Sequence, residues 1–160
     1  MTAGSKRRFG SRRGNALIEF ALAAMVLTYA LTGVFQLGYS MYLYNEIVGA
    51  VRAGARYASL AKFSNAGDGS VPTAYSTAVK NMVAYGNINP ANGAQPVVPN
   101  LSTANVNVAV NFDSGNVPTD CTVSISSYTI DAVFTTFTLT NKPSYKIHYF
   151  GRYCSSGTSC

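Results

Sequence analysis

Residues 12–20 read Arg-Arg-Gly-Asn-Ala-Leu-Ile-Glu-Phe, and a long apolar run follows them. From Ala16 to Leu37 this run supplies the roughly 20 apolar residues that cross a bilayer as a helix. Glu19 lies near the start of the run, although a carboxylate among lipid tails is energetically costly and is therefore a candidate functional residue. The pattern predicts a membrane-spanning helix in which Glu19 has a role.

The same helix is expected to continue beyond the membrane as far as Lys62. No proline interrupts residues 45–62, and small and apolar residues recur there at helical spacing. Ala50, Gly54 and Ala58 form a stripe of small residues, which allows another element to approach closely. That element is either the chain's own domain or a neighbouring subunit, and both readings stay open.

Charge is concentrated at the N-terminus. Five of the twelve basic residues precede Asn15, whereas the remaining seven are nearly balanced by six acidic residues. Positive residues directly before an apolar run hold the N-terminus in the cytoplasm, and we prefer this reading to nucleic-acid binding. We expect residues 1–14 to be unstructured, because glycines and clustered like charges disfavour a helix. An ordinary signal peptide is disfavoured, because the small residues at 21–23 come before an apolar core is complete.

The basic segment, the glycine and the later glutamate together resemble the prepilin signature of type IV pilins and pseudopilins. The resemblance implies cleavage between Gly14 and Asn15, which makes Glu19 the fifth residue of the mature chain. The pair Glu19-Phe20 and residues 52–58, Arg-Ala-Gly-Ala-Arg-Tyr-Ala, resemble more closely the TadE-like minor pilins of the Tad (tight adherence, Flp) pilus system.

This resemblance covers roughly the first 60 residues and implies a function, partners and a location. The function is that of a minor pilin or pseudopilin required for assembly or initiation of a Tad/Flp-type IV pilus used in adherence. The partners are a prepilin peptidase, other pilins or pseudopilins of the same filament, and inner-membrane platform proteins with their cytoplasmic ATPase. Many relatives carry a proline where this chain has Met25, so we expect a straighter helix there.

The implied location is the bacterial inner membrane, crossed once, with the N-terminus cytoplasmic and the C-terminal domain periplasmic, or the extracellular pilus. Two alternatives remain. One is a membrane-anchored periplasmic binding domain or enzyme, and the other is a pseudopilin of type II secretion.

We predict an α+β fold with three parts: a leader over 1–14, a spine helix over 15–62 that spans the membrane at about 16–38, and a periplasmic domain over 63–160. In the domain, Pro72 suits the first turn of a second helix that runs through Tyr85.

Beyond that helix the sequence reads as strands. Residues 106–112 and 121–130 alternate at period two, and residues 144–150 form a third candidate strand. Val133 to Thr140 is either a fourth strand or a long loop. The sequence therefore predicts an antiparallel sheet of three or four strands.

No constellation of catalytic residues is apparent, so we expect neither an enzyme nor a cofactor. The single histidine, His148, has aromatic neighbours and is interpreted as a structural or surface residue. Asn111, Asp113, Asn116 and Asp120 offer the oxygen ligands that calcium prefers, but turn formation explains them better than any known calcium loop.

Three cysteines complete the candidate set. Cys121, Cys154 and Cys160 could bind zinc with His148, but exported thiols meet an oxidising compartment, which favours a disulfide over a metal site.

The pairing depends on strand order. If 121–130 and 144–153 are antiparallel neighbours, Cys121 lies opposite residue 153 or 154, and we predict a Cys121–Cys154 disulfide. If 133–140 pairs with 145–152 instead, the two cysteines lie at opposite ends of the sheet. Cys154–Cys160 is then the competing pairing.

Overall fold

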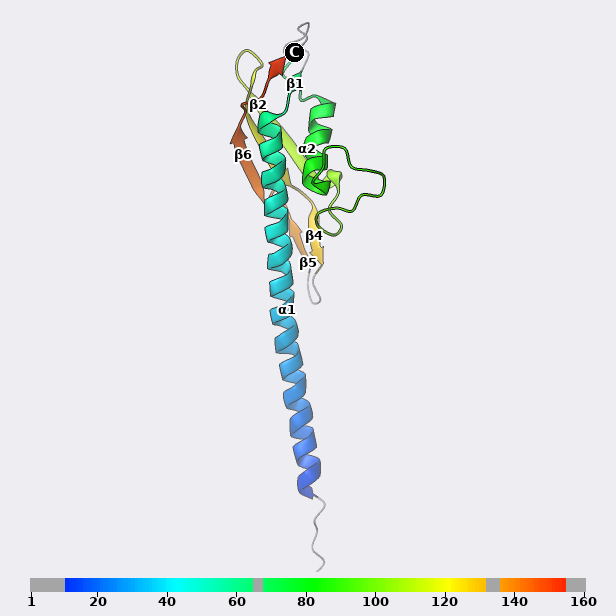
Figure 1. The fold of residues 1–160 in the computed structure, drawn as a ribbon. Helices are drawn as coiled ribbons and strands as arrows, with labels where there is room; N and C mark the ends of the chain where they lie inside the picture. Colours follow the sequence, from blue (N-terminus) through cyan, green and yellow to red (C-terminus); the bar gives the residue numbers. More distant parts are fainter. Residues whose placement is uncertain (1–10, 65–67, 132–135, 155–160) are drawn as a thin grey trace, which may run out of the picture. The chain divides into compact units, whose positions relative to one another are not determined.

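The computed structural model describes residues 11–64, 68–131 and 136–154, with the backbone alone for residues 11–13. The chain divides into two compact units, Met1–Tyr39 and Ser40–Cys160. Helix α1 (Ser11–Leu60) contributes residues to both, and the second unit also holds a second helix and small sheets (Figure 1). The predicted α+β fold is confirmed.

Helix α1 is longer at its N-terminus than the sequence predicted. It begins at Ser11 rather than Asn15, so residues 11–14 are helical and the prediction that they are unstructured is wrong. Extending an existing helix is far easier than nucleating one, and this gain outweighs the roughly 1 kcal/mol that Gly14 costs. Residues 1–10 of the predicted leader lie outside the described residues.

The second helix, α2 (Thr73–Tyr85), forms where it was predicted. Pro72 is its N-cap, and Gly86 ends it with a left-handed φ of 68°. The Gly86 N–H donates to the carbonyl of Met82 at 3.0 Å, which closes the last turn. A 3₁₀ turn, η1 (Thr103–Asn105), leads into the strands.

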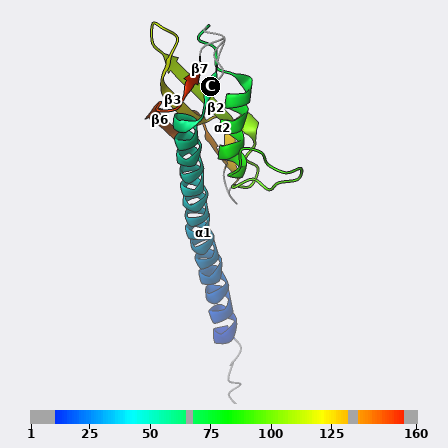
Figure 2. The same ribbon diagram turned by 45° about the horizontal axis from the view of Figure 1, so that its top comes forward.

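In the described residues, seven short strands form three separate sheets. They are β1 (Phe63–Ser64), β2 (Val106–Phe112), β3 (Pro118–Ile125), β4 (Tyr128–Asp131), β5 (Thr136–Leu139), β6 (Ser144–His148) and β7 (Tyr153–Cys154). β2, β3 and β6 form an antiparallel sheet in that order, β4 and β5 form an antiparallel pair, and β1 pairs with β7 in parallel. α2 and β6 lie on opposite sides of the C-terminal part of α1 in both ribbon views (Figure 2).

The strand predicted over 121–130 is two strands. Ser127 has a φ of 56°, a left-handed conformation that turns the chain between β3 and β4. β4 then pairs with β5, so residues 136–139 are a strand that does not pair with β6. The alternative arrangement, in which 133–140 pairs with 145–152, is therefore wrong.

The predicted Cys121–Cys154 disulfide is also wrong, because Cys121 is a free, buried thiol. β3 and β6 are indeed antiparallel neighbours, but Cys121 lies opposite Ile147. The register differs because β3 ends at Ile125. Cys154 lies opposite Ser64 in the β1–β7 pair. The competing Cys154–Cys160 pairing stays a prediction, since Cys160 lies outside the described residues.

The core of the second unit forms between α1, α2 and the strands. Ala50 and Ala58 are 7% and 0% exposed, and a Cβ built on Gly54 would overlap Val83 Cγ2 of α2. Within this unit the small-residue stripe therefore packs on the chain's own domain. Phe63 is fully buried, and its ring lies 4.9 Å from that of Tyr75 in an edge contact.

The carbonyl groups at the end of α1 find donors outside the helix. The Tyr75 hydroxyl donates to the Ala58 carbonyl at 2.6 Å, the Phe150 N–H donates to the Ser59 carbonyl at 2.8 Å, and just beyond the helix the Tyr149 hydroxyl donates to the Ala61 carbonyl at 2.8 Å. Burial raises the pKa of Tyr149 to about 12 and that of Tyr75 still further, so both hydroxyls keep their protons. These bonds satisfy carbonyls that have no partner inside the helix.

The contact at Gly54 gives a first prediction. Gly54→Ala should destabilise the protein by about 1–3 kcal/mol, because the new methyl group overpacks against Val83. Gly49→Ala is the matched control: a Cβ there meets nothing within 4 Å, so it should be neutral or stabilising by about 0.5–1 kcal/mol. Thermal unfolding followed by circular dichroism measures both, and equal shifts in the two variants would contradict this account.

The state of Cys121 gives a second prediction. Burial raises the pKa of its thiol, and the reactive thiolate is therefore scarce. A maleimide should leave Cys121 unlabelled in the native full chain and label it after denaturation. Cys121→Ser identifies the labelled site. A Cys121–Cys154 cross-link in non-reducing peptide maps would show that this description is incorrect.

Candidate functional site: the apolar half of helix α1

In the first unit, residues 14–39 of α1, called here the apolar half, carry apolar side chains on all sides of the helix. The following large apolar side chains in this part of the chain are each more than half exposed: Leu17, Ile18, Phe20, Leu22, Met25, Val26, Leu27, Tyr29, Leu31, Val34, Phe35 and Leu37. An exposed apolar surface of this extent marks a membrane or protein contact. Of the helices in the described residues, α1 is the one whose length and composition suit a membrane span, and the span predicted at about 16–38 lies within it.

Two threonine hydroxyl groups in this half of α1 are satisfied by the helix itself. Thr28 donates to the carbonyl of Ala24 and Thr32 donates to the carbonyl of Thr28, both at 2.8 Å. Such bonds to the preceding turn let threonine lie in an apolar environment without an unmet donor.

Glu19 differs from these groups because its charge has no partner among the described residues. Its side chain is exposed, and no hydrogen bond or ion pair involves it there. It is also the one charged residue between Gly14 and Tyr39. Asn15 lies one helical turn earlier on the same face, and the adjacent Phe20 is 72% exposed.

The predicted cleavage bond lies in the first turn of α1. The first four N–H groups of a helix have no partner inside it, and Ser11 to Gly14 are the first four residues of α1. Gly14 adds the backbone freedom of a residue without Cβ, and a Cβ built on it would meet no atom outside its own stretch of helix within 4 Å. This turn can therefore unwind without disturbing the rest of the helix.

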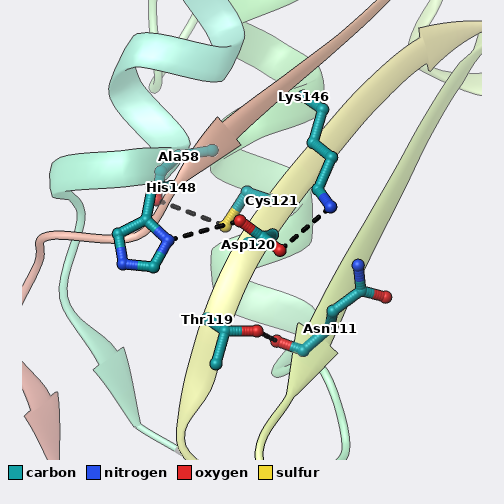
Figure 3. A network of polar contacts seen from close by, with 7 residues as sticks. All are labelled: Ala58, Asn111, Thr119, Asp120, Cys121, Lys146 and His148. Carbon is teal, nitrogen blue, oxygen red and sulfur yellow. Dashed lines mark hydrogen bonds and ion pairs between the residues drawn. The ribbon is translucent and has the colours of Figure 1, made fainter.

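A second cluster, which sequence reasoning missed, lies on the outer face of the β3–β6 pair (Figure 3). The Asp120 carboxylate lies 3.0 Å from Lys146 Nζ and 3.3 Å from His148 Nδ1. The hydrogen bond from Lys146, and then that from His148, lowers the pKa of Asp120. The strand register, which places Asp120 opposite His148, could not be read from the sequence.

The residues considered as metal ligands have other partners. Asp113 Oδ1 accepts bonds from the N–H groups of Gly115 at 2.9 Å and Val117 at 2.8 Å, which is the work of a turn residue. Cys121 Sγ lies 3.1 Å from the Tyr75 hydroxyl, inside the domain. Within the described ranges, no three His, Cys, Asp or Glu side chains are placed to hold a metal ion.

Apart from the two cysteines of the predicted disulfide, the predicted site residues fall into two separate groups. Gly14, Asn15, Glu19 and Phe20 lie within two turns at the start of α1, and Ala50, Gly54 and Ala58 lie in the core of the second unit.

The apolar helix and the small α+β domain that follows it are compatible with a protein anchored in a membrane by a single span. Residues 14–56 match the model of a family described as TadE, TadE-like protein. This match confirms the resemblance to the TadE-like proteins of the Tad system, and it covers the part of α1 that holds Gly14, Glu19 and Gly54. No curated protein and no solved structure matches the chain.

Proposed function

We propose that this chain is a minor pilin or pseudopilin that is cleaved after Gly14 and is required to assemble or initiate a Tad-type adherence pilus. The single observation that carries the proposal is Glu19, an exposed carboxylate that has no partner among the described residues and is the one charge between Gly14 and Tyr39 of α1. The match over residues 14–56 supports a general association with the Tad pilus.

Cleavage supplies the partner that Glu19 lacks. It creates an amine on Asn15, four residues before Glu19, at the start of a helix. A positive charge there opposes the helix dipole, whereas a carboxylate in the first turns complements it. At the membrane edge both groups reach water or headgroups. In a filament core each would lose that solvation, which is costly for an unpaired charge.

A neighbouring subunit resolves this cost when its amine meets the Glu19 carboxylate. The pair favours one axial offset between subunits, so it acts on register more than on net stability. The partners of this proposal are a prepilin peptidase, other pilins of the filament, and platform proteins with their ATPase. The basic residues ahead of Asn15 support an orientation with the N-terminus in the cytoplasm and the second unit in the periplasm.

The competing function is a membrane-anchored periplasmic binding domain or enzyme. It requires an uncleaved anchor and no dependence on Glu19, so the two experiments below separate it from a pilin. A type II secretion pseudopilin would share both results, and neighbouring genes distinguish it.

Processing gives the third prediction. Gly14→Val should abolish cleavage, because a β-branched side chain stands where a narrow peptidase site accepts only hydrogen. Mass spectrometry of membrane-extracted wild type should show a chain that begins at Asn15, and the variant should keep Met1 or Thr2. A wild-type chain with an intact leader, in cells with active peptidase, would refute the proposal.

Assembly gives the fourth prediction. Glu19→Leu should remain anchored and cleaved but should abolish surface pili, while Glu19→Asp should be partly defective because its side chain is shorter. Glu46→Leu is the matched control, since it makes the same change on α1 outside the apolar half, and it should keep piliation. Electron microscopy counts the pili and immunoblots check processing. Normal piliation by a cleaved, stable Glu19→Leu protein would exclude this role for Glu19.

A further inference from the structure

Strand β6 is an open edge of the three-stranded sheet. Among the described residues it pairs with β3 alone. The Tyr149 N–H donates to the Thr119 carbonyl at 2.8 Å, and the Ile125 N–H donates to the Pro143 carbonyl at 3.1 Å. Residues alternate along a strand, so the odd-numbered residues of β6 direct their main-chain groups to β3. The main-chain groups of Ser144, Lys146 and His148 therefore point away from the sheet, and no described residue bonds them.

The side chains on this strand leave the edge accessible. Lysine often blunts an edge strand by reaching across it. Here the Asp120 carboxylate on β3 holds both Lys146 and His148 over the outer face of the sheet, at 3.0 and 3.3 Å (Figure 3). The cluster therefore draws two bulky side chains back from the edge.

A groove of about 440 Å³ lies beside this edge, between α1 and the start of β6. Its lining comes from two segments, Tyr44, Asn45, Val48, Val51 and Arg52 on α1, and Lys142, Pro143, Ser144 and Tyr145 before and within β6. Arg52 and Lys142 are exposed cations without an ion pair among the described residues, and the lining contains no acidic side chain. The groove is apolar at Val48 and Tyr145 and positive at its two cations.

We propose that this groove binds an extended acidic segment of a partner protein, which adds to β6 as a further strand. Its main chain bonds Ser144, Lys146 and His148, and its alternate side chains enter the groove. There, carboxylates meet Arg52 and Lys142, and aliphatic groups meet Val48 and Tyr145. Three alternate positions of β6 have outward main-chain groups with no partner among the described residues, and this spacing matches the main chain of a polypeptide strand rather than a nucleic acid or another polyanion. The proposal does not depend on the pilin function.

The probe is a fluorescein-labelled octapeptide of sequence Thr-Glu-Thr-Val-Thr-Glu-Thr-Val, titrated with the full chain in detergent and followed by anisotropy. Replacing both glutamates by lysine should weaken binding by about tenfold, as expected for two exposed charge pairs. The double variant Arg52→Glu, Lys142→Glu should reverse this preference. Failure of the glutamate peptide to bind at about 1 mM, or equal affinity for both peptides, would overturn the proposal.

Two substitutions at one position test the strand edge. Lys146→Pro removes an outward N–H and covers the edge, so it should weaken binding by about tenfold or more. Lys146→Ala keeps the N–H and loses only the contact with Asp120, so it should stay within about twofold.

Equal binding by these two variants would exclude strand addition. A single-stranded oligonucleotide that displaces the peptide equally well from the Lys146→Pro and Lys146→Ala variants would show that the groove binds polyanions in general. That result would also overturn the proposal. If Lys146→Pro fails to fold by circular dichroism, the charge-reversal exchange alone decides between the outcomes.

Discussion

At Gly54 the backbone of α1 lies against Val83 of α2, and no group larger than hydrogen fits between them without movement. This close approach sets how the domain is built, because it brings α2 near enough for Tyr75 to reach the Ala58 carbonyl. Tyr149 and Phe150, which follow β6 in the chain, donate to the carbonyls of Ala61 and Ser59. The end of α1 thus needs no glycine cap, since the domain that packs on it supplies the missing donors.

One helix therefore meets two opposite physical requirements. Its last turns bury small residues against protein, while its apolar half exposes large residues that need lipid or another helix. Thr28 and Thr32 in that half donate their hydroxyl groups to helix carbonyls. Glu19 is the polar group there whose charge has no partner among the described residues. An exposed carboxylate is stable at the edge of a membrane, where water solvates it. Moving it into a desolvated position is favourable only if a positive group pairs with it there.

The packing of the domain on α1 also creates the groove beside strand β6. β6 runs beside α1, so the flank of the helix becomes one wall of a groove whose other wall is a strand edge. The ionic cluster at Asp120 lies on the outer face, where it fixes two side chains at the edge strand rather than forming a chemical site. Anchoring by one end of α1 and recognition beside its other end are compatible, because they use different residues.

Local pattern alone determined the long helix, the second helix from Pro72 to Gly86, and the positions of Gly14 and Glu19. Periodicity, apolar length and turn residues are properties of neighbouring positions, so they can be read directly. The strand at 106–112 was predictable for the same reason.

Only the tertiary structure decided the strand register, and with it the cysteines. A left-handed Ser127 ends one strand and starts another, which shifts Cys121 from position 153 or 154 to Ile147 and buries it beside Tyr75. The parallel β1–β7 pair, the Asp120 cluster and the groove at β6 likewise join segments far apart in the chain. Their contacts depend on how α1 and α2 approach each other, and that approach is a property of the packed domain rather than of any single segment.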